Sequence, residues 1–479
     1  MMHDAIIIGA GVIGANIARE LARYQLDIIV LEKNLDVCEG ASKANSGIVH
    51  SGYDAKPGSL KAKYNIRGNK MMAALCAELA VSFRQNGSLV VAFDAEEAIR
   101  LETLLDQGVQ NGVEGLRIID GETARLQEPN LSQNVTAALW APTGGIVDPF
   151  QLTLAAAEVA DLNGVAFHFG TAVTAISCTN GVFNVETSKG HYAARIVVNA
   201  AGVHADDLNN RLSSHKYQIT PRKGEYCLFD KQIGGLVTST IFQLPSAMGK
   251  GVLVTPTAEG NLLIGPNSVF VDDKSDTSTT EAGIRFVIDK AKQSVDNLPM
   301  PYVITAFAGL RATEKHEDFV IGEAEDVPGF FNALGIESPG LTAAPAIAQD
   351  MAGWIAAKLD AVPKPHYDGR RNRQPSFESL SVEMKQAMFQ KDKNYGRIIC
   401  RCELVTLAEI LDCIRRPLGA RTVDGVKRRT RAGSGRCQGG FCSPRIIEIL
   451  ARELGKDLRE IVKASEKSAY LIGLDKDLL

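Results

Sequence analysis

The sequence lacks an apolar run long enough to cross a membrane, and it is poor in cysteine for its length. A spanning helix needs roughly 18–20 apolar residues, and no such run occurs in the chain. Nine cysteines among 479 residues exclude a disulfide-dense secreted scaffold. A basic segment followed by a cleavage site is also missing near the start, so we expect no signal peptide. These absences predict a cytoplasmic protein with reduced thiols.

The sequence also lacks internal repeats, low-complexity tracts and a strong net charge. The net charge of −4 gives no indication of a polyanionic partner for the whole molecule. The charge is nevertheless uneven, because residues 396–479 hold 17 Lys and Arg against 11 Asp and Glu, a net of +6 that leaves −10 for residues 1–395. A polar stretch with three prolines, residues 363–375, separates the two parts and predicts an interdomain connection.

What is present at the N-terminus is a strand, a glycine-rich turn, a helix and a second strand. In order, these are Ala5–Ile8, the glycines Gly9, Gly11 and Gly14, a helix to about Tyr24, and Asp27–Leu31. Gly11 would let the backbone approach a pyrophosphate, and Gly14 would let the helix pack closely on the strand. Glu32 ends the second strand, where its carboxylate suits a pair of ribose hydroxyls. The unit predicts a dinucleotide site but leaves FAD and NAD open.

Two later segments favour FAD, although each is also compatible with ordinary turn chemistry. Residues 195–202 form a strand that ends in small residues, Ala201 and Gly202, which would let the chain approach the same cofactor. Residues 335–344 form a loop that leads into an apolar helix. The N-terminus of a helix near a flavin would stabilise negative charge on the reduced ring.

Further apolar runs outnumber the strands that one parallel sheet requires. They lie at 88–93, 165–169, 195–200, 251–255, 261–264 and 330–334, with helical patterns at 68–86, 94–111, 149–163 and 343–359. We therefore predict an α/β FAD-binding Rossmann-like domain interleaved with a mixed or antiparallel-sheet substrate domain, plus a small, mainly helical C-terminal domain. The predicted bounds are 1–80, 145–215 and 310–360 for the FAD-binding domain, 81–144 and 216–309 for the substrate domain, 361–395 for a linker, and 396–479 for the C-terminal domain.

The order of these segments resembles the D-amino-acid-oxidase-type FAD oxidoreductases over about residues 3–360. The loop Ala41-Ser-Lys-Ala-Asn-Ser-Gly-Ile-Val-His50-Ser-Gly adds to the likeness. The resemblance implies FAD as the cofactor, bound by Gly9, Gly11, Gly14, Glu32, Ser42, Asn45, Ser46, Ala201, Gly202, Gly340, Leu341 and Thr342.

Within that family the chain most resembles the FAD-dependent glycerol-3-phosphate dehydrogenases and oxidases. The residues that carry this likeness are 48–54, 56–63, 145–149, 219–225, 250–256 and 309–313. Residues 45–63 are also similar to enzymes that oxidise L-2-hydroxyglutarate, so this stretch does not choose between the two substrates.

The resemblance implies oxidation of a secondary alcohol with hydride transfer to the flavin. His50 is the candidate base, since an imidazole can take up a proton at neutral pH. Lys250 and Arg311 lie where similar enzymes bind the anionic group of the substrate, and Ser338 would add a hydrogen bond. A structural histidine and ordinary solvated surface charges are the alternatives for these residues. Lys61 and its neighbouring lysines are expected to be solvated or structural.

Five of the nine cysteines crowd the C-terminal part, and four of them form two close pairs. One residue separates Cys400 from Cys402, and four separate Cys437 from Cys442. Four thiolates suit tetrahedral zinc or an iron–sulfur cluster, and the first pair is tighter than the usual structural zinc pair. Residues 398–450 resemble the bacterioferritin-associated-ferredoxin-like [2Fe–2S] domain, which implies these four cysteines as ligands. The simplest members space the second pair by two residues, so zinc and free thiols stay open.

Two helices are predicted beside the cysteine pairs. Thr406 and Glu409 form a capping box at the start of the first helix, which carries Cys413 as a buried thiol. Ser443 is the predicted cap of the second helix, with Pro444 at its first position. Glycines at 433, 435, 439 and 440 would expose backbone N–H groups to cluster sulfurs.

A basic run, Lys427-Arg428-Arg429-Thr-Arg431, lies between the two cysteine pairs. It has no interleaved aromatic residue for stacking on bases, so we expect no nucleic acid. An anionic thiolate cluster nearby, or an acidic electron-transfer partner, is a better reason for the arginines. We expect an electron-acceptor protein or partner subunits. With no transmembrane segment, any association with a membrane would go through those partners.

The main hypothesis is oxidation of a small anionic substrate, sn-glycerol 3-phosphate, to dihydroxyacetone phosphate, with electrons leaving through the [2Fe–2S] domain. The first alternative is a dehydrogenase or oxidase for L-2-hydroxyglutarate or another 2-hydroxy acid. The second is a non-catalytic electron-transfer subunit of a larger dehydrogenase. Direct transfer to oxygen also stays open at this point, because oxygen access is a property of the pocket.

Overall fold

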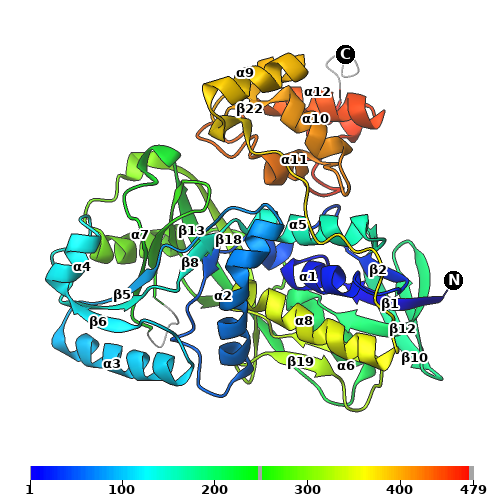
Figure 1. Ribbon diagram of the computed structural model, residues 1–479, viewed down its shortest axis with the longest axis horizontal. Helices are drawn as coiled ribbons and strands as arrows, with labels where there is room; N and C mark the ends of the chain where they lie inside the picture. The colour runs from blue at the N-terminus through cyan, green and yellow to red at the C-terminus, as the bar shows by residue number, and fades with distance from the viewer. Residues whose placement is uncertain (1, 246–250, 474–479) are drawn as a thin grey trace.

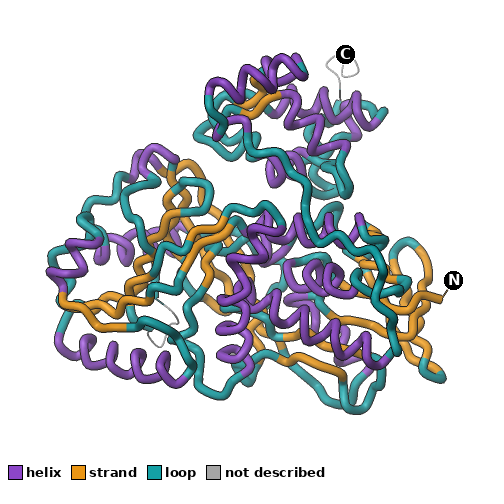
Figure 2. Tube along the Cα trace, in the orientation of Figure 1, coloured by secondary structure: helices purple, strands orange, loops and turns teal. Residues whose placement is uncertain are grey.

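The chain forms a large lobe and a small lobe (Figure 1). The computed structural model describes residues 2–245 and 251–473. The large lobe contains two main β-sheets with helices packed on them, whereas the small lobe is mainly helical (Figure 2). Within those residues, no helix combines the length and the apolar character that a membrane span requires. The arrangement agrees with the predicted fold class.

The first sheet holds the glycine-rich turn. Over the described residues its strands, in spatial order, are β10 (Val173–Thr179), β11 (Val182–Thr187), β12 (Gly190–Asn199), β1 (Met2–Ile8), β2 (Ile28–Leu31) and β9 (Ala166–His168), with β20 (Phe330–Leu334) beside β12 and β19 (Val320–Glu323) beside β20. β1 runs parallel to both β2 and β12. Ile7 of β1 faces one apolar layer, and Ile6 and Ile8 face the other. β1 is therefore a central strand buried on both faces.

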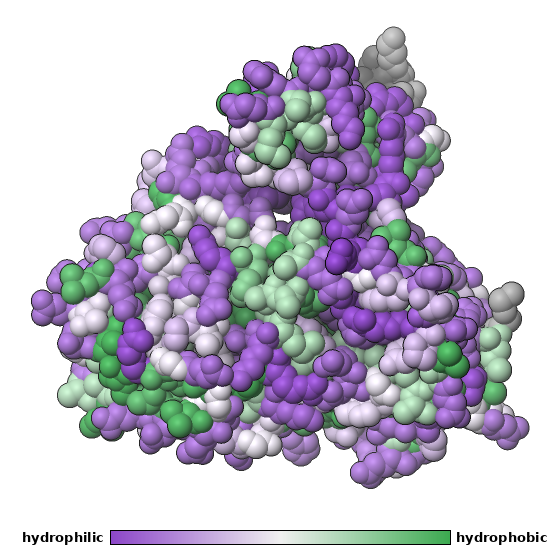
Figure 3. Space-filling view, in the orientation of Figure 1, coloured by the Kyte–Doolittle hydropathy of each residue, from purple (hydrophilic) through white to green (hydrophobic). Residues whose placement is uncertain are grey.

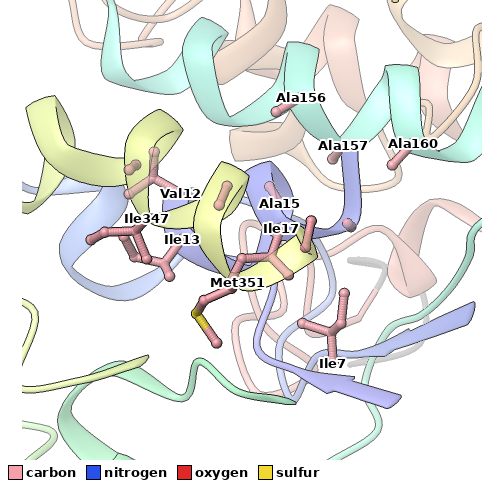
Figure 4. Close-up of a cluster of buried hydrophobic side chains, with 14 of the residues drawn as sticks. Ile7, Val12, Ile13, Ala15, Ile17, Ala156, Ala157, Ala160, Ile347 and Met351 are labelled. Carbon is pink, nitrogen blue, oxygen red and sulfur yellow. The ribbon is translucent and has the colours of Figure 1, made fainter. Parts of the chain in front are cut away.

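The main core lies between this sheet and a layer of helices (Figure 4). The helices are α1 (Val12–Leu21), α2 (Leu60–Glu78), α5 (Pro149–Leu162) and α8 (Gly340–Lys358). Alanines on the facing sides of α1 and α5, such as Ala15 and Ala156, are fully buried and allow close approach of the two helices. Ile17 and Met351 fill the space between α1, α8 and β1. This packing fixes the start of α1, where the glycines lie.

The second sheet belongs to the substrate side of the large lobe. Its strands, in order over the described residues, are β17 (Val269–Phe270), β13 (Ile219–Phe229), β16 (Leu262–Gly265), β15 (Leu253–Pro256), β14 (Thr240–Gln243), β5 (Ser88–Ala92), β7 (Ala137–Ala141) and β6 (Arg117–Asp120), with β18 (Val303–Glu314) beside β13. Its helices are α3 (Ala95–Gln110), α4 (Gly121–Gln127) and α7 (Glu281–Ser294). All pairs are antiparallel except β5 with β14. Three short strands, β3 (Ile48–Val49), β4 (Phe83–Arg84) and β8 (Gly145–Val147), form a separate ribbon.

The small lobe has its own apolar core around short helices. The elements are α9 (Val382–Lys391), β21 (Ile398–Cys400), β22 (Val405–Thr406), α10 (Leu407–Arg415), α11 (Val423–Thr430) and α12 (Ser443–Leu454). The predicted capping box is confirmed, because Thr406 Oγ1 accepts a hydrogen bond from the Glu409 N–H at 3.3 Å while the Glu409 carboxylate accepts from the Thr406 N–H at 2.8 Å. α11 lies on the underside of the lobe, above α5 (Figure 1).

Three local predictions differ from the structure. The helix predicted at 68–86 begins at Leu60, where the Ser59 side chain caps it by accepting from the Ala62 N–H, and it ends at Glu78. The predicted linker 361–395 contains a helix, α9, that was not predicted. The cap of α12 is Cys442, one residue before the predicted Ser443.

Candidate active site

A cavity of about 1250 Å³ runs from the glycine turn of the first sheet to the second sheet. At the end nearest the turn it is lined by Gly9, Gly11, Glu32, Ser42, Asn45, Ser46, Ala201 and Gly202, and at the other end by His50, Arg311, Ser338, Gly340 and Leu341. These residues come from segments far apart in the sequence. The cavity therefore joins most of the predicted cofactor and substrate residues in a single space.

The glycine turn leaves no room for side chains. Gly9 has φ +104°, and a Cβ there would lie 2.5 Å from the Ala200 carbonyl oxygen. A Cβ on Gly14 would lie 2.0 Å from the Gly9 oxygen, and a Cβ on Gly11 would lie 3.0 Å from Ser42 Oγ. Gly11 caps α1 without a side-chain bond, and the first N–H of the helix, that of Val12, donates to Ser42 Oγ at 2.9 Å, so an anion in the cavity would meet the N–H groups that follow it. This cradle fits the pyrophosphate of a dinucleotide.

Glu32 lies at the predicted place, directly after β2, and it lines the cavity. Its carboxylate accepts hydrogen bonds from the Ala10 N–H at 2.8 Å and from the Asn34 N–H at 2.8 Å. Burial raises the pKa of this carboxyl group. The carboxylate thus ties the glycine turn to the end of β2, and it fits a ribose hydroxyl pair at this position.

Two predicted cofactor residues lie behind the cavity wall. Gly14 and Thr342 are not among the described residues that line the cavity. Gly14 serves the close packing already described. The Thr342 hydroxyl accepts from the His50 N–H at 2.9 Å and donates to the Ile48 carbonyl at 3.3 Å. Thr342 therefore links the start of α8 to the chain that carries His50.

His50 is held by contacts on its backbone and on its ring. Besides the bond to Thr342, its carbonyl oxygen accepts from Asn69 Nδ2 at 3.1 Å. Its Nε2 lies 3.1 Å from Ser338 Oγ, and its ring centroid lies 5.9 Å from that of Phe242. The structure thus brings the predicted base and Ser338 together. Because Ser338 touches His50, it is positioned to orient the imidazole.

Arg311 lies on β18 and lines the cavity. It donates to the carbonyl oxygens of Arg222 at 3.2 Å, Lys223 at 3.3 Å and Asn267 at 2.9 Å. Within residues 2–245 and 251–473, it has no ion pair with a carboxylate. Burial lowers the pKa of Arg311, so its positive charge is costly there without an anion. This is the electrostatic setting of an anion-binding arginine.

A buried carboxylate beside Ser338 was not predicted. Glu337 binds Lys61 Nζ at 2.7 Å, Arg222 Nη2 at 2.6 Å and Thr313 Oγ1 at 2.8 Å. Burial alone would raise the pKa of Glu337, but the two cations lower it to about 2. The expected structural role of Lys61 is consistent with this contact. The signal for Glu337 in the sequence was its place next to Ser338, but its partners are far away along the chain.

Lys250 lies outside the described residues, and its predicted role in anion binding stays a prediction.

The four cysteines of the small lobe lie as two interacting pairs. Cys400 is hydrogen-bonded to Cys442, and Cys402 to Cys437. The Cys442 contact, with backbone N–H groups of Gly433 and Glu403, lowers the pKa of Cys400 to about 6. The N–H of Phe441 lowers the pKa of Cys437. All nine cysteines of the chain are free thiols.

The donor set is suited to an iron–sulfur centre. Among the described residues, no group of three or more His, Cys, Asp or Glu side chains is placed so that it could hold a metal ion. The sulfurs nevertheless lie on two loops of one small core, and main-chain N–H groups are directed at them. Four thiols with such N–H donors fit a [2Fe–2S] cluster. Cys413 is buried on α10, as predicted, and burial raises its pKa to about 12.

The arginines of the basic run make contacts that the sequence did not predict. Arg428 and Arg429 are buried, and both bind the carboxylate of Asp36 in the large lobe. Arg431 binds the buried Glu403 at 2.7 Å. Arginines that are neutralised inside the molecule do not present a basic surface to an acidic partner, so docking of such a partner is not the reason for these three residues. The other predicted reason, an anionic thiolate cluster nearby, stays a prediction.

Comparisons with known proteins agree with the predicted family and cofactors. Residues 4–354 match the family model described as FAD dependent oxidoreductase, and residues 398–452 match the BFD-like [2Fe-2S] binding domain. A glycerol 3-phosphate dehydrogenase of Caloramator mitchellensis is 50% identical over 478 residues, 99% of each chain. A glycerol 3-phosphate oxidase of Mycoplasma genitalium is 35% identical over 74% of this chain and 95% of its own. The solved structure of an L-α-glycerophosphate oxidase from Mycoplasma pneumoniae with FAD bound has a TM-score of 0.75 and 31% identity, over 78% of this chain and 99% of that one.

Proposed function

The chain belongs to the family of FAD-dependent oxidoreductases and carries a BFD-like [2Fe–2S] binding domain, and we propose that it oxidises sn-glycerol 3-phosphate to dihydroxyacetone phosphate. The predicted family, fold class and cofactors are confirmed. The observation that supports this substrate concerns the residues that line the cavity away from the glycine turn. There a histidine and an arginine without a carboxylate partner among the described residues share the space that begins at the glycine turn.

His50 takes the hydroxyl proton of the substrate in this proposal. Oxidation of a secondary alcohol to a ketone removes a hydride from the carbinol carbon and a proton from its hydroxyl group. Bound FAD supplies the hydride acceptor. The His50 imidazole is the proton acceptor, through the ring nitrogen that Ser338 does not contact, and Ser338 Oγ, 3.1 Å from Nε2, holds the ring in orientation. Changing His50 to Asn should slow reduction of the bound flavin by about 10²- to 10⁴-fold, with FAD still bound. Near-normal single-turnover reduction would contradict this role.

Arg311 holds the phosphate of the substrate. Its three carbonyl contacts fix the guanidinium without neutralising it, so a dianionic phosphate completes its electrostatic environment. Lys250 is the proposed second cation. Binding of the phosphate group by Arg311 and contact of the hydroxyl group with His50 would together orient the carbinol carbon of the substrate within the cavity.

The experiment that tests the substrate is an anaerobic titration of the loaded protein, followed by the flavin absorbance. Bleaching by sn-glycerol 3-phosphate supports the proposal. Bleaching by L-2-hydroxyglutarate and not by glycerol 3-phosphate would favour a 2-hydroxy acid as substrate, because a carboxylate also suits Arg311. No bleaching by either compound would favour a non-catalytic electron-transfer subunit.

Electrons leave through the small lobe to an acceptor protein in this proposal. The loops that carry the cysteines expose Phe441 and Leu404, with 79% and 44% of their surface accessible, and Arg401 and Arg445 are exposed nearby. An apolar tip with basic neighbours suits a small acidic redox protein. Stopped-flow reduction should show flavin bleaching followed by reduction of the cluster. Rapid peroxide formation in air with an unreduced cluster would instead favour direct transfer to oxygen.

A further inference from the structure

The contact between the two lobes is centred on a buried carboxylate. Asp36 follows β2 in the large lobe and is 4% exposed. It accepts from Arg428 Nη2 at 2.9 Å, and from Arg429 Nη1 at 2.6 Å and Nη2 at 2.7 Å. Arg429 forms a two-pronged pair, the geometry in which guanidinium and carboxylate interact most strongly. A buried carboxylate with such partners is costly to separate from them, because each charge would be left without a counter-ion.

The loop that carries Asp36 is also the loop that holds the glycine turn. Two residues beyond Asp36, the Cys38 N–H donates to the Ala10 carbonyl at 3.0 Å. The Ala10 N–H in turn donates to the Glu32 carboxylate at the start of the loop. At the end of the loop, Ser42 Oγ accepts from the Val12 N–H at 2.9 Å. The turn that fits the pyrophosphate is therefore braced by the segment that the small lobe holds in place.

The small lobe also forms part of the cavity wall. The residues that it contributes are Asp424, Lys427, Arg428, Arg431, Ser434 and Gln438. Arg428 lies 2.9 Å from the carboxylate of Glu39, which lines the same cavity from the large lobe. The small lobe thus closes one side of the space in which the dinucleotide residues lie.

Further polar contacts fix the small lobe in this orientation. Arg431 Nη2 donates to Asn261 Oδ1 at 2.8 Å, and Gln151 Nε2 on α5 donates to the Arg428 carbonyl at 2.8 Å. Arg436 lies 3.2 Å from the Asp230 carboxylate. The seam between the lobes is correspondingly hydrophilic on the visible face (Figure 3). The lobes are joined by directional bonds, which specify one orientation.

We propose that the C-terminal domain contributes to FAD binding. Its helix α11, through the ion pairs of Arg428 and Arg429 with Asp36, holds the loop that cradles the dinucleotide. FAD retention and docking of the small lobe are then coupled. Coupling of this kind is reciprocal, so bound FAD also strengthens docking. The domain acts as a fixed wall of the cofactor site. This proposal rests on FAD binding and not on the identity of the substrate.

The test is the dissociation constant of FAD for the full-length protein, measured by flavin fluorescence during titration of the FAD-free form. The Asp36→Asn variant keeps the size of the side chain and removes its charge. It should raise the dissociation constant by at least about tenfold. The matched control is Asp230→Asn, which removes the charge of another aspartate paired across the same interface. This variant should change the constant by less than about twofold.

An unchanged FAD dissociation constant in folded Asp36→Asn protein would overturn the proposal, and so would equal weakening in both variants. If Asp36→Asn does not fold, Arg428→Gln replaces it, because the Arg429 pair remains in that variant. It should still weaken FAD binding relative to Asp230→Asn. The reciprocal measurement uses wild-type protein, in which hydrogen exchange of the α11 amides should slow when FAD is added. Exchange that does not respond to FAD would contradict the coupling.

Discussion

Arg311 and Arg429 are both withdrawn from bulk water, but the protein surrounds them differently. Three backbone carbonyls hold Arg311, and it has no carboxylate partner among the described residues. Arg429 is paired at both guanidinium prongs with Asp36, a residue of the other lobe. Carbonyl dipoles orient a guanidinium without cancelling its charge, whereas a carboxylate cancels it. The first arrangement leaves a charge for a ligand, and the second uses the charge to join two lobes.

The largest expected effect is on Arg311, the cation that has no carboxylate partner within residues 2–245 and 251–473. Changing Arg311 to Gln should lower kcat/KM for the proposed substrate by about 1,000-fold, or about 4 kcal/mol, because the anionic group loses its charged partner. The matched control is Arg222→Gln on the neighbouring strand, opposite Arg311 in the ladder. Arg222 is already paired with Glu337, so its loss should cost less than about tenfold. Similar losses in steady-state kinetics for both variants would remove the distinction between them.

The next largest effect is a loss of stability, and it is expected at Arg429, the arginine that joins the two lobes. Changing Arg429 to Gln leaves Asp36 buried with a single cationic partner. The free energy of opening α11, measured by native-state hydrogen exchange, should fall by about 3 kcal/mol. Arg415→Gln is the control, because its pair with Glu453 is largely exposed on the arginine side. That variant should lower the same free energy by less than about 1 kcal/mol. Equal losses would mean that burial does not distinguish the two pairs.

A smaller effect, on activity, is expected from the contact between Ser338 and His50 in the cavity. Ser338→Ala removes the hydroxyl that lies 3.1 Å from His50 Nε2. Flavin reduction should slow by about tenfold, since one hydrogen bond that orients the base is lost. KM should change little, because the proposed anion contact of Arg311 remains. A rise in KM with an unchanged rate of flavin reduction would indicate that Ser338 binds substrate and does not position His50.

The part of the site that the sequence predicts is the part encoded locally. The order of Gly9, Gly11, Gly14 and Glu32 identifies the turn, because a strand, a helix start and a second strand are adjacent in the chain. The capping box at Thr406 is local in the same way. The helix misjudged at 68–86 shows the limit of this approach, because the Ser59 cap lies outside its apolar periodicity.

The part that could not be predicted depends on pairs distant in sequence. Asp36 and Arg429 are 393 positions apart, and Lys61 and Glu337 are 276 apart. No periodicity or spacing indicates that such residues meet. A run of arginines therefore appears as a free basic surface until its carboxylate partner is placed. For the same reason, the sequence does not distinguish an arginine that holds a ligand from one that joins two lobes.

The smallest expected effect concerns Glu337, which neutralises two cations close to Arg311 and so allows the comparison between Arg311 and paired cations to be tested by pH. Its pKa is about 2 in the folded protein, below the ordinary value of 4.5. A lowered folded-state pKa adds stability that is complete above the unfolded value and is lost as pH falls toward the folded value. Between pH 5 and 3.5, wild-type protein should lose about 1 kcal/mol of its stability advantage over Glu337→Gln, as measured by urea unfolding. An advantage that is constant across this range would mean that the carboxylate is not held ionised by Lys61 and Arg222, and the contrast with Arg311 would then lose its electrostatic basis.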